Sequence, residues 1–475
     1  MLEADVIDVG RDELDSVLAS AHEAARSYLR DVDDRPVRPA GAEDVARAFS
    51  QELPERGAGA QAALDELVEL AAGTAIGSAG PRFFHFVIGG VTPAALAADW
   101  LTSTLDQNAF ARVSSPLASR LETLSLEWLK ELFRLPSEWG GVLTTGATAA
   151  NFTCLAAARG WWAGQLGVDV DSEGLSGLPP VPVLAGGHVH ATALKALAML
   201  GIGRSAVRIL AADGTGRLDV PALETELRAL GGAPAILLAT AGDVNTGAFD
   251  PIDRLATLAQ EHNAWLHVDG AFGAFARLTP RVSTLAEGID RAASVTADGH
   301  KWLNVPYDCG FAFVRDPEAL ARTFTLAASY LPAGSEENFG YLSPESSRRA
   351  RGIATWATLR AYGRAGYREL VERHLDLAQR LARRVDEADD FELLAPVPLN
   401  IVCFRFRPAG LNEDALDELN GRLAEAVLSD GRVYVGSTRY DGKVAFRPAI
   451  VNWRTREEDV DLIVEVVREL GSTLT

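Results

Sequence analysis

The sequence predicts an α/β fold in which helices cover both faces of a mainly parallel sheet. Between residues 141 and 314, apolar runs of strand length alternate with stretches of helical spacing, as in repeated βαβ units. Short helical segments precede this region, and a smaller α+β region follows a long helix expected at residues 366–388. The chain has 475 residues, which is more than one hydrophobic core usually holds.

Three regions follow from this pattern. Residues 1–90 form a helical arm whose segments are too small to build a core, so they must pack on the main domain or on a second subunit. Residues 91–330 form the large domain that contains the sheet. Residues 331–475 form a mobile loop of turn composition, residues 331–340, and a small C-terminal domain. The helical segments of the arm are expected at residues 11–32, 45–49 and 62–72.

Each later element has its own signal in the sequence. Strands of the large domain are short apolar runs, expected at residues 181–185, 207–211, 235–240 and 265–268. Its helices are expected at residues 93–105, 192–200, 219–230 and 252–261, with Asp219 as the cap of the third and Pro221 in its first turn. For the C-terminal part we expect helices at residues 346–362, 413–428 and 457–470 and strands at residues 401–406, 433–436 and 444–448.

Charge and cysteine content exclude several classes of function. The formal net charge of −20 argues against binding to nucleic acids or anionic membranes. Cys154, Cys309 and Cys403 are widely spaced in apolar surroundings, which indicates reduced core thiols and neither disulfides nor a zinc site. The acidic N-terminus is unlike a signal peptide and no apolar run reaches membrane-spanning length, so the expected location is the cytoplasm.

Two segments carry the strongest chemical signal. Residues 267–271 read His-Val-Asp-Gly-Ala at the end of an apolar strand, and residues 298–302 read Asp-Gly-His-Lys-Trp between two apolar strands. A loop lysine is usually a surface residue, but a lysine desolvated in a pocket can form an imine. Asp269 lies at the carboxyl end of a strand, where parallel sheets bind ligands. His267 shares a strand face with Asp269 and is interpreted as structural.

These two segments resemble those of the group II amino acid decarboxylases, which include aromatic amino acid, glutamate and cysteine sulfinate decarboxylases. That family depends on pyridoxal 5′-phosphate (PLP) and has the aspartate-aminotransferase-type fold, PLP fold type I. The resemblance runs from about residue 81 to residue 470. It implies a seven-stranded-type sheet, a small C-terminal domain, an N-terminal arm, PLP as cofactor, and a homodimer with active sites built from both chains.

The resemblance assigns residues to each part of the cofactor. Lys301 forms the imine, Asp269 pairs with the ring nitrogen, and the small Ala271 packs under the ring. The phosphate is expected at the N-terminus of a helix, where backbone N–H groups attract anions. This turn comprises Gly146, Ala147 and Thr148, and His300 is the expected second contact.

Further residues are matched to the substrate and to proton transfer. His190 aligns with the histidine that stacks on the cofactor ring, and His188 is a competing candidate two residues earlier. Arg447 matches the arginine that binds the substrate α-carboxylate, although a solvated arginine at a strand end is the alternative. Tyr341 matches a loop tyrosine that helps return a proton to the substrate carbon after CO₂ leaves, although the loop is a few residues shorter here.

The implied reaction is α-decarboxylation of an L-amino acid. Phe86 and Phe110 indicate a substrate with an apolar or aromatic side chain. Three alternatives remain open: an aldehyde synthase that uses oxygen, an aminotransferase, and a non-catalytic protein that binds PLP or a partner. The sequence departs from the family at two places, because Asp298-Gly299 replaces Asn-Pro and residues 242–246 replace a Gly-Thr-Thr turn.

Overall fold

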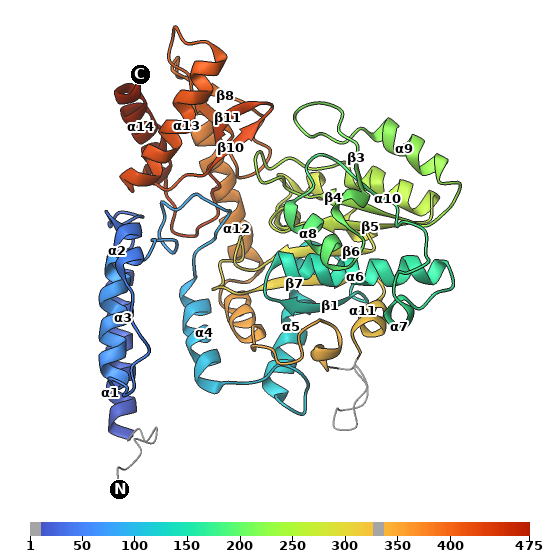
Figure 1. The fold of residues 1–475 in the computed structure, drawn as a ribbon, viewed down its shortest axis with the longest axis horizontal. Helices are drawn as coiled ribbons and strands as arrows, with labels where there is room; N and C mark the ends of the chain where they lie inside the picture. Colours follow the sequence, from blue (N-terminus) through green and yellow to red (C-terminus); the bar gives the residue numbers. More distant parts are fainter. Residues whose placement is uncertain (1–10, 326–336) are drawn as a thin grey trace.

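A seven-stranded sheet is the central feature of the computed structural model, which describes residues 11–325 and 337–475 (Figure 1). The strand order is β1-β7-β6-β5-β4-β2-β3. Strands β2 to β6 pair in parallel, whereas β7 is antiparallel to both of its neighbours, β6 and β1. This confirms the predicted, mainly parallel sheet. The strands are β1 (Gly140–Thr144), β2 (Val183–Ala185), β3 (Val207–Ile209), β4 (Ala235–Thr240), β5 (Ala264–Asp269), β6 (Ser294–Asp298) and β7 (Gly310–Val314).

Helices enclose this sheet. Strands β4, β6 and β7 are buried along their whole length, which requires cover on both faces. The helices of this part are α4 (Pro93–Leu105), α5 (Pro116–Phe133), α6 (Ala147–Gln165), α7 (Val170–Glu173), α8 (Ala191–Met199), α9 (Val220–Ala229), α10 (Ile252–Glu261) and α11 (Pro317–Phe324). Helix α10 has the predicted bounds, and the predicted cap Asp219 accepts a hydrogen bond from Ala222 N–H at 3.0 Å.

Short 3-10 helices connect several of these elements. They are η1 (Arg204–Ala206), η2 (Gly273–Leu278), η3 (Ser283–Ala286), η4 (Ile289–Arg291) and η5 (Phe339–Tyr341). Among them, η2 begins at Gly273, shortly after β5 ends at Asp269, and packs against α5 and α12.

A second hydrophobic core lies in the C-terminal part of the chain. It is formed by α12 (Gly352–Asp386), α13 (Glu413–Asp430), α14 (Glu457–Leu474) and an antiparallel sheet of order β10-β11-β9-β8. The strands are β8 (Phe391–Leu393), β9 (Phe404–Phe406), β10 (Ser437–Tyr440) and β11 (Lys443–Phe446). Gly363, with φ +58°, interrupts α12 where two separate helices were predicted.

Two predicted elements differ from the structure. The helix expected from residue 346 begins at Gly352, because Arg348, Arg349 and Arg351 lie in an irregular segment where their side chains form ion pairs. The strand expected at residues 433–436 is a single bridge between Tyr434 and Phe83. This bridge joins the end of the N-terminal region to the C-terminal core. The division of the chain at residues 90 and 330 stays a prediction.

The N-terminal arm consists of α1 (Arg11–Asp31), α2 (Ala42–Ala48) and α3 (Ala60–Thr74). Figure 1 shows α1 and α3 side by side, at the edge of the molecule and away from the sheet. Leu14, Leu18 and Leu67 are more than half exposed on this arm. In the part of the chain that the structure describes, no helix is both long and apolar enough to cross a membrane. The three cysteines are buried free thiols.

Candidate active site

A cavity of about 460 Å³ lies at the carboxyl ends of β5 and β6. Asp269 ends β5 and Asp298 ends β6, and both line the cavity. Phe110 and Tyr341 are not among the described residues that line it. The predicted site residues that do line it are Phe86, Gly146, Ala147, Thr148, His190, Asp269, Ala271, His300, Lys301 and Arg447. Segments as far apart in the sequence as Phe86 and Arg447 therefore meet at one place.

Lys301 is half-buried, with an aromatic ring beside its ammonium and a close glycine contact at its backbone. Its ammonium lies 5.6 Å from the centre of the Phe272 ring. Gly89 packs against the backbone on the other side, where its N–H donates to the carbonyl of His300 at 3.0 Å. A Cβ atom at Gly89 would lie 1.7 Å from the carbonyl oxygen of Lys301, so only glycine fits there. The glycine-ended run after Phe86 thus forms one side of the lysine site.

A directed chain of hydrogen bonds ends on the carboxylate of Asp269. Trp265 N–H donates to Ser294 Oγ at 2.9 Å, and Ser294 Oγ lies 2.9 Å from Nδ1 of His267. His267 Nε2 lies 2.9 Å from Oδ1 of Asn151, whose amide donates to Asp269 Oδ2 at 2.8 Å. Because the Asn151 amide donates to Asp269, its oxygen must accept, so Nε2 of His267 carries the proton.

Burial lowers the pKa of His267 to about 4, so the imidazole is neutral within this series of hydrogen bonds. A neutral imidazole can accept at Nδ1 and donate at Nε2, as the chain requires. His267, interpreted from the sequence as structural, therefore positions Asn151, which holds Asp269. Asn151 was missed in the sequence. Trp265, His267 and Asp269 are two residues apart in β5 and therefore point to the same face of the strand. Asn151 comes from α6, and only the tertiary fold brings it next to them.

The predicted phosphate turn lies at the start of α6. Gly146 is the N-terminal residue before the helix, has φ +146° and provides no side-chain cap. The first amides of a helix have no partner within it and can bind an anion, although here the Ala147 N–H donates to Oδ2 of Asp298 at 3.3 Å. A Cβ at Gly310 would lie 2.4 Å from the carbonyl carbon of Gly146. Glycines therefore allow the turn to approach β7 and the loop that bears His300.

His190 is held in one orientation by the start of α8. Its Nδ1 lies 2.7 Å from Oγ1 of Thr192 and accepts the Thr192 N–H at 3.3 Å. Nε2 therefore carries the proton of the neutral ring. Burial lowers the pKa of His190; the charge of Asp269 opposes this decrease, whereas the charges of Lys301 and Arg447 add to it. His188 also lines the cavity, but its Nδ1 lies 4.0 Å from a carboxylate oxygen of Asp243.

Arg447 follows β11 and is buried in the wall of the cavity. Its guanidinium donates to the carbonyl of Val244 at 3.3 Å. Burial lowers the pKa of Arg447, and the carboxylate of Asp243 opposes that decrease. The loop at residues 242–246, which departs from the family sequence, therefore supports the arginine. Phe86 is 59% exposed at the cavity, and its ring is tilted by 32° against that of His85 with ring centres 3.5 Å apart.

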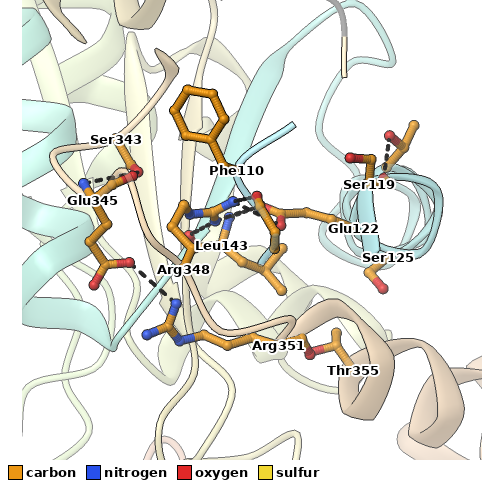
Figure 2. A network of polar contacts seen from close by, with 12 residues as sticks. Phe110, Ser119, Glu122, Ser125, Leu143, Ser343, Glu345, Arg348, Arg351 and Thr355 are labelled. Carbon is orange, nitrogen blue, oxygen red and sulfur yellow. Dashed lines mark hydrogen bonds and ion pairs between the residues drawn. The ribbon is translucent and has the colours of Figure 1, made fainter. Parts of the chain in front are cut away.

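Phe110 and Tyr341 form a separate buried cluster. Their rings pack edge to face with centres 5.3 Å apart, and Gly340 N–H donates to the carbonyl of Phe110 at 2.8 Å. Figure 2 shows the ion pair between Arg348 and Glu122 beside Phe110. Residues 331–336 of the predicted loop lie outside the described residues. The proton-transfer role of Tyr341 stays a prediction, because the described structure does not bring it to the cavity of its own chain.

Comparison with known proteins identifies the family. The model of the pyridoxal-dependent decarboxylase conserved domain matches residues 43–407, which is more than half of the chain. The chain belongs to the pyridoxal-dependent decarboxylase family. It is therefore a PLP-dependent carboxy-lyase, as the two sequence segments predicted. The residues at the cavity fit PLP, since they combine a half-buried amine beside the Phe272 ring, a carboxylate held by Asn151 and a helix N-terminus at which Gly146 provides no side-chain cap.

Members of this family with full-length similarity differ in substrate. An aromatic-L-amino-acid decarboxylase of Bacillus atrophaeus is 28% identical over 94% of this chain and 93% of its own. An L-2,4-diaminobutyrate decarboxylase of Rhizobium meliloti is 32% identical over 89% of this chain and 84% of its own. A crystal structure of Oryza sativa TDC with PLP and tryptamine is 27% identical, covers 99% of both chains and superposes with a TM-score of 0.90. The fold is PLP fold type I, as predicted.

Proposed function

We propose that this enzyme catalyses α-decarboxylation of an L-amino acid with an apolar or aromatic side chain, releasing CO₂ and the amine. The observation that carries the proposal is the convergence of Lys301, Asp269, His190 and Arg447 on one cavity. Phe86 and Phe272 line the same cavity, which supports an apolar substrate side chain. Both relatives are named as amino acid decarboxylases, and their named substrates differ in the side chain.

Bound PLP would supply an electron sink for the charge that remains after CO₂ leaves. Lys301 would hold the aldehyde carbon of the cofactor. Asp269 would accept a hydrogen bond from the protonated ring nitrogen, and Asn151 would keep the carboxylate in place. Backbone N–H groups of the turn at residues 146–148, with His300, would hold the phosphate. Ala271 would leave space for the ring.

The substrate would be oriented by two further residues. The guanidinium of Arg447 would bind the α-carboxylate through charge-assisted hydrogen bonds. His190 would stack on the cofactor as a neutral imidazole, and its Nε2–H would remain available as a donor. A proton must then reach the substrate carbon, and we assign its delivery to the phenol of Tyr341.

This assignment requires a second chain. We propose a homodimer in which the segment containing Phe110 and Tyr341 approaches the active site of the partner, because it lies outside the cavity of its own chain. The exposed leucines of the arm and a groove of about 670 Å³ between α1 and α3 support a second copy as the occupant of this face. The buried free thiols support a reducing location, the cytoplasm.

An aldehyde synthase is the second candidate function. Among the described residues that line the cavity there is no tyrosine. If no phenol reaches the reacting carbon, protonation loses its general acid, and reaction with oxygen would give an aldehyde, ammonia and peroxide. The same cofactor and the same cavity would serve both reactions.

A screen of L-amino acids for CO₂, amine and peroxide distinguishes the two candidates. We expect CO₂ and amine in equal amounts, with little peroxide, and the fastest turnover with an apolar or aromatic substrate. Tyr341→Phe should reduce amine formation by about 10²- to 10⁴-fold, the usual contribution of a general acid. Lys301→Ala should remove both the visible absorbance of bound PLP and all turnover. Stoichiometric peroxide from the wild type would favour the aldehyde synthase.

A further inference from the structure

Asp298 is a buried carboxylate at the phosphate end of the cavity. It is 2% exposed and lines the cavity together with Gly146, Ala147 and His300. Its Oδ2 accepts the N–H of Ala147, the first amide of α6, at 3.3 Å. One of the amides proposed to hold the phosphate is therefore in contact with a group that can carry a negative charge. The family has asparagine where this chain has Asp298, and asparagine has no such charge.

The second carboxylate oxygen of Asp298 faces His300. Its Oδ1 lies 3.1 Å from Nδ1 of the imidazole. Both atoms are buried, and in this orientation neither makes a hydrogen bond to any described residue, so the two are in close contact but not yet joined by one. Tyr307 stacks on the imidazole with ring centres 4.2 Å apart, which fixes the ring beside the carboxylate. Two buried polar atoms without other partners are costly unless a proton lies between them.

A phosphate dianion beside an ionised Asp298 would meet a like charge in a poorly solvated place. Among the described residues that line the cavity, Lys301 and Arg447 carry positive charge. Both are assigned to other groups, Lys301 to the cofactor aldehyde and Arg447 to the substrate carboxylate. Asp269, at the end of the adjacent strand, is a further negative charge.

Among the described residues, the loop after Asp298 and the start of α12 supply no free cation besides Lys301. Burial raises the pKa of Tyr307 and of Cys309 to about 12 each, and the charge of Asp298 adds to both increases, so these groups stay neutral. Arg351, at the start of α12, forms ion pairs with Asp308 at 2.7 Å and Glu345 at 3.2 Å. His300 is therefore the described side chain in direct contact with Asp298 that can offset its charge.

We infer that Asp298 and His300 bind the cofactor phosphate as a pair that shares one proton, which is taken up from solvent when the phosphate enters. This inference rests on the proposed PLP site. With the proton between Oδ1 and Nδ1, the pair has no net charge and tolerates the dianion. Without the proton, Asp298 repels it. Cofactor affinity should therefore decrease as the pH rises and the proton is lost.

Asp298→Asn tests this inference, because the variant keeps the size of the side chain and an oxygen for Ala147 N–H but removes the charge. The probe is pyridoxamine 5′-phosphate, which has no aldehyde and cannot form an imine with Lys301. Between pH 7 and 9, the wild-type Kd should rise by up to about tenfold per pH unit above the pH at which the proton leaves. The variant should show a nearly flat profile and bind at least tenfold more tightly at pH 9.

Two controls isolate the phosphate and the pair. Pyridoxamine, which lacks the phosphate, should bind equally to the wild type and to Asp298→Asn. His300→Gln should weaken binding of the phosphate form more in the wild type than in the Asp298→Asn background. Calorimetry in two buffers of different ionisation enthalpy should report proton uptake by the wild type that the Asn variant lacks.

The possible failures are distinguishable. Equal pH profiles for the wild type and Asp298→Asn, or weaker binding by the variant at pH 9, would overturn the shared proton and leave the PLP site intact. If the wild type binds neither PLP nor pyridoxamine 5′-phosphate at any pH, the proposed site itself is wrong, and this inference fails with it.

Discussion

Arg348 and Glu122 form an ion pair that is completely enclosed, with the two side chains 0% and 1% exposed. Two hydrogen bonds of 2.8 and 3.1 Å join the guanidinium to the carboxylate (Figure 2). Arg348 also donates to the carbonyls of Ala109 and Leu143, and Glu122 accepts the N–H of Leu143. The pair therefore connects the Phe110 segment with β1, the strand that leads into the proposed phosphate turn.

Removing one charge of this pair should destabilise the fold strongly. Glu122→Gln leaves the guanidinium of Arg348 buried without a counter-charge, which typically costs about 3–5 kcal/mol. Glu131→Gln is the matched control, because Glu131 is 65% exposed and pairs with Arg364 at the surface, where a pair contributes about 0–1 kcal/mol. Chemical denaturation followed by circular dichroism measures both. Similar midpoints for the two variants would contradict the expectation.

Asn151→Leu should impair catalysis although it leaves every ionisable side chain of the cavity in place. The substitution removes the amide that donates to Asp269, and a hydrogen bond to a charged group contributes about 1.5–3 kcal/mol. We expect kcat to fall by about 10- to 100-fold, with an altered visible spectrum of bound PLP. Thr153→Val is the control, because Thr153 is buried in the same helix and, among the described residues, its hydroxyl donates only to the carbonyl of Ala149 one turn earlier. An unchanged kcat in Asn151→Leu would remove this residue from the mechanism.

Gly89→Ala should disrupt the lysine site through the backbone. The added Cβ would lie 1.7 Å from the carbonyl oxygen of Lys301, so the segment or the lysine must move. We expect weaker PLP binding and at least about a tenfold loss of kcat, since misplacement by about 1 Å can cost 10²-fold. Gly164→Ala, in α6 with open space around it, should leave activity unchanged. Equal activity of the two variants would show that the segment adapts.

His374 makes stability depend on pH. Trp302 N–H donates to its Nδ1 at 2.8 Å, and its Nε2 lies 3.0 Å from the carbonyl of Asn452. Burial lowers its pKa to about 3, whereas the unfolded chain binds the proton near pH 6.5. The unfolded state therefore gains the proton first, and the free energy of unfolding should fall by about 1.4 kcal/mol per pH unit below about pH 6.5. In His374→Gln this part of the slope between pH 7 and 5 should disappear; identical slopes would argue against it.

Deleting residues 1–80 tests the dimer. The described part of the arm presents exposed leucines and forms no core of its own, so we expect the truncated protein to be insoluble, or monomeric and inactive. Sedimentation velocity measures the assembly, and CO₂ release measures the activity. A fully active truncated monomer would exclude the shared active site.

The sequence was most informative where a single element carries the signal. Helix α10 and strand β5 follow from local periodicity, and Asp269 and Lys301 follow from short segments at strand ends. Asn151 could not be predicted, because its role depends on how α6 crosses β5. The segment before α12 was wrongly predicted as helix, because its irregular form also depends on contacts between distant parts of the chain. The contacts of Arg348 with α5 and β1 outweigh the local preference of that segment.

Phe110 was assigned to the substrate pocket from its residue type and the family resemblance. Residue type alone does not say which chain supplies a wall, and in the described structure Phe110 packs on Tyr341. For Asp298, in contrast, the sequence alone showed that the residue differs from the asparagine of the family. Its consequence required the distance to His300.

Cys309 has a practical consequence for following this enzyme in solution. The thiol is 2% exposed on the loop that also carries Lys301, and a Cβ at Gly299 would lie 2.8 Å from its sulfur. Because thiolates are the reactive form and this group is held as a thiol, alkylating reagents must wait for the loop to open. The rate of alkylation at Cys309, measured by mass spectrometry, therefore reports local unfolding beside Lys301 without an engineered label.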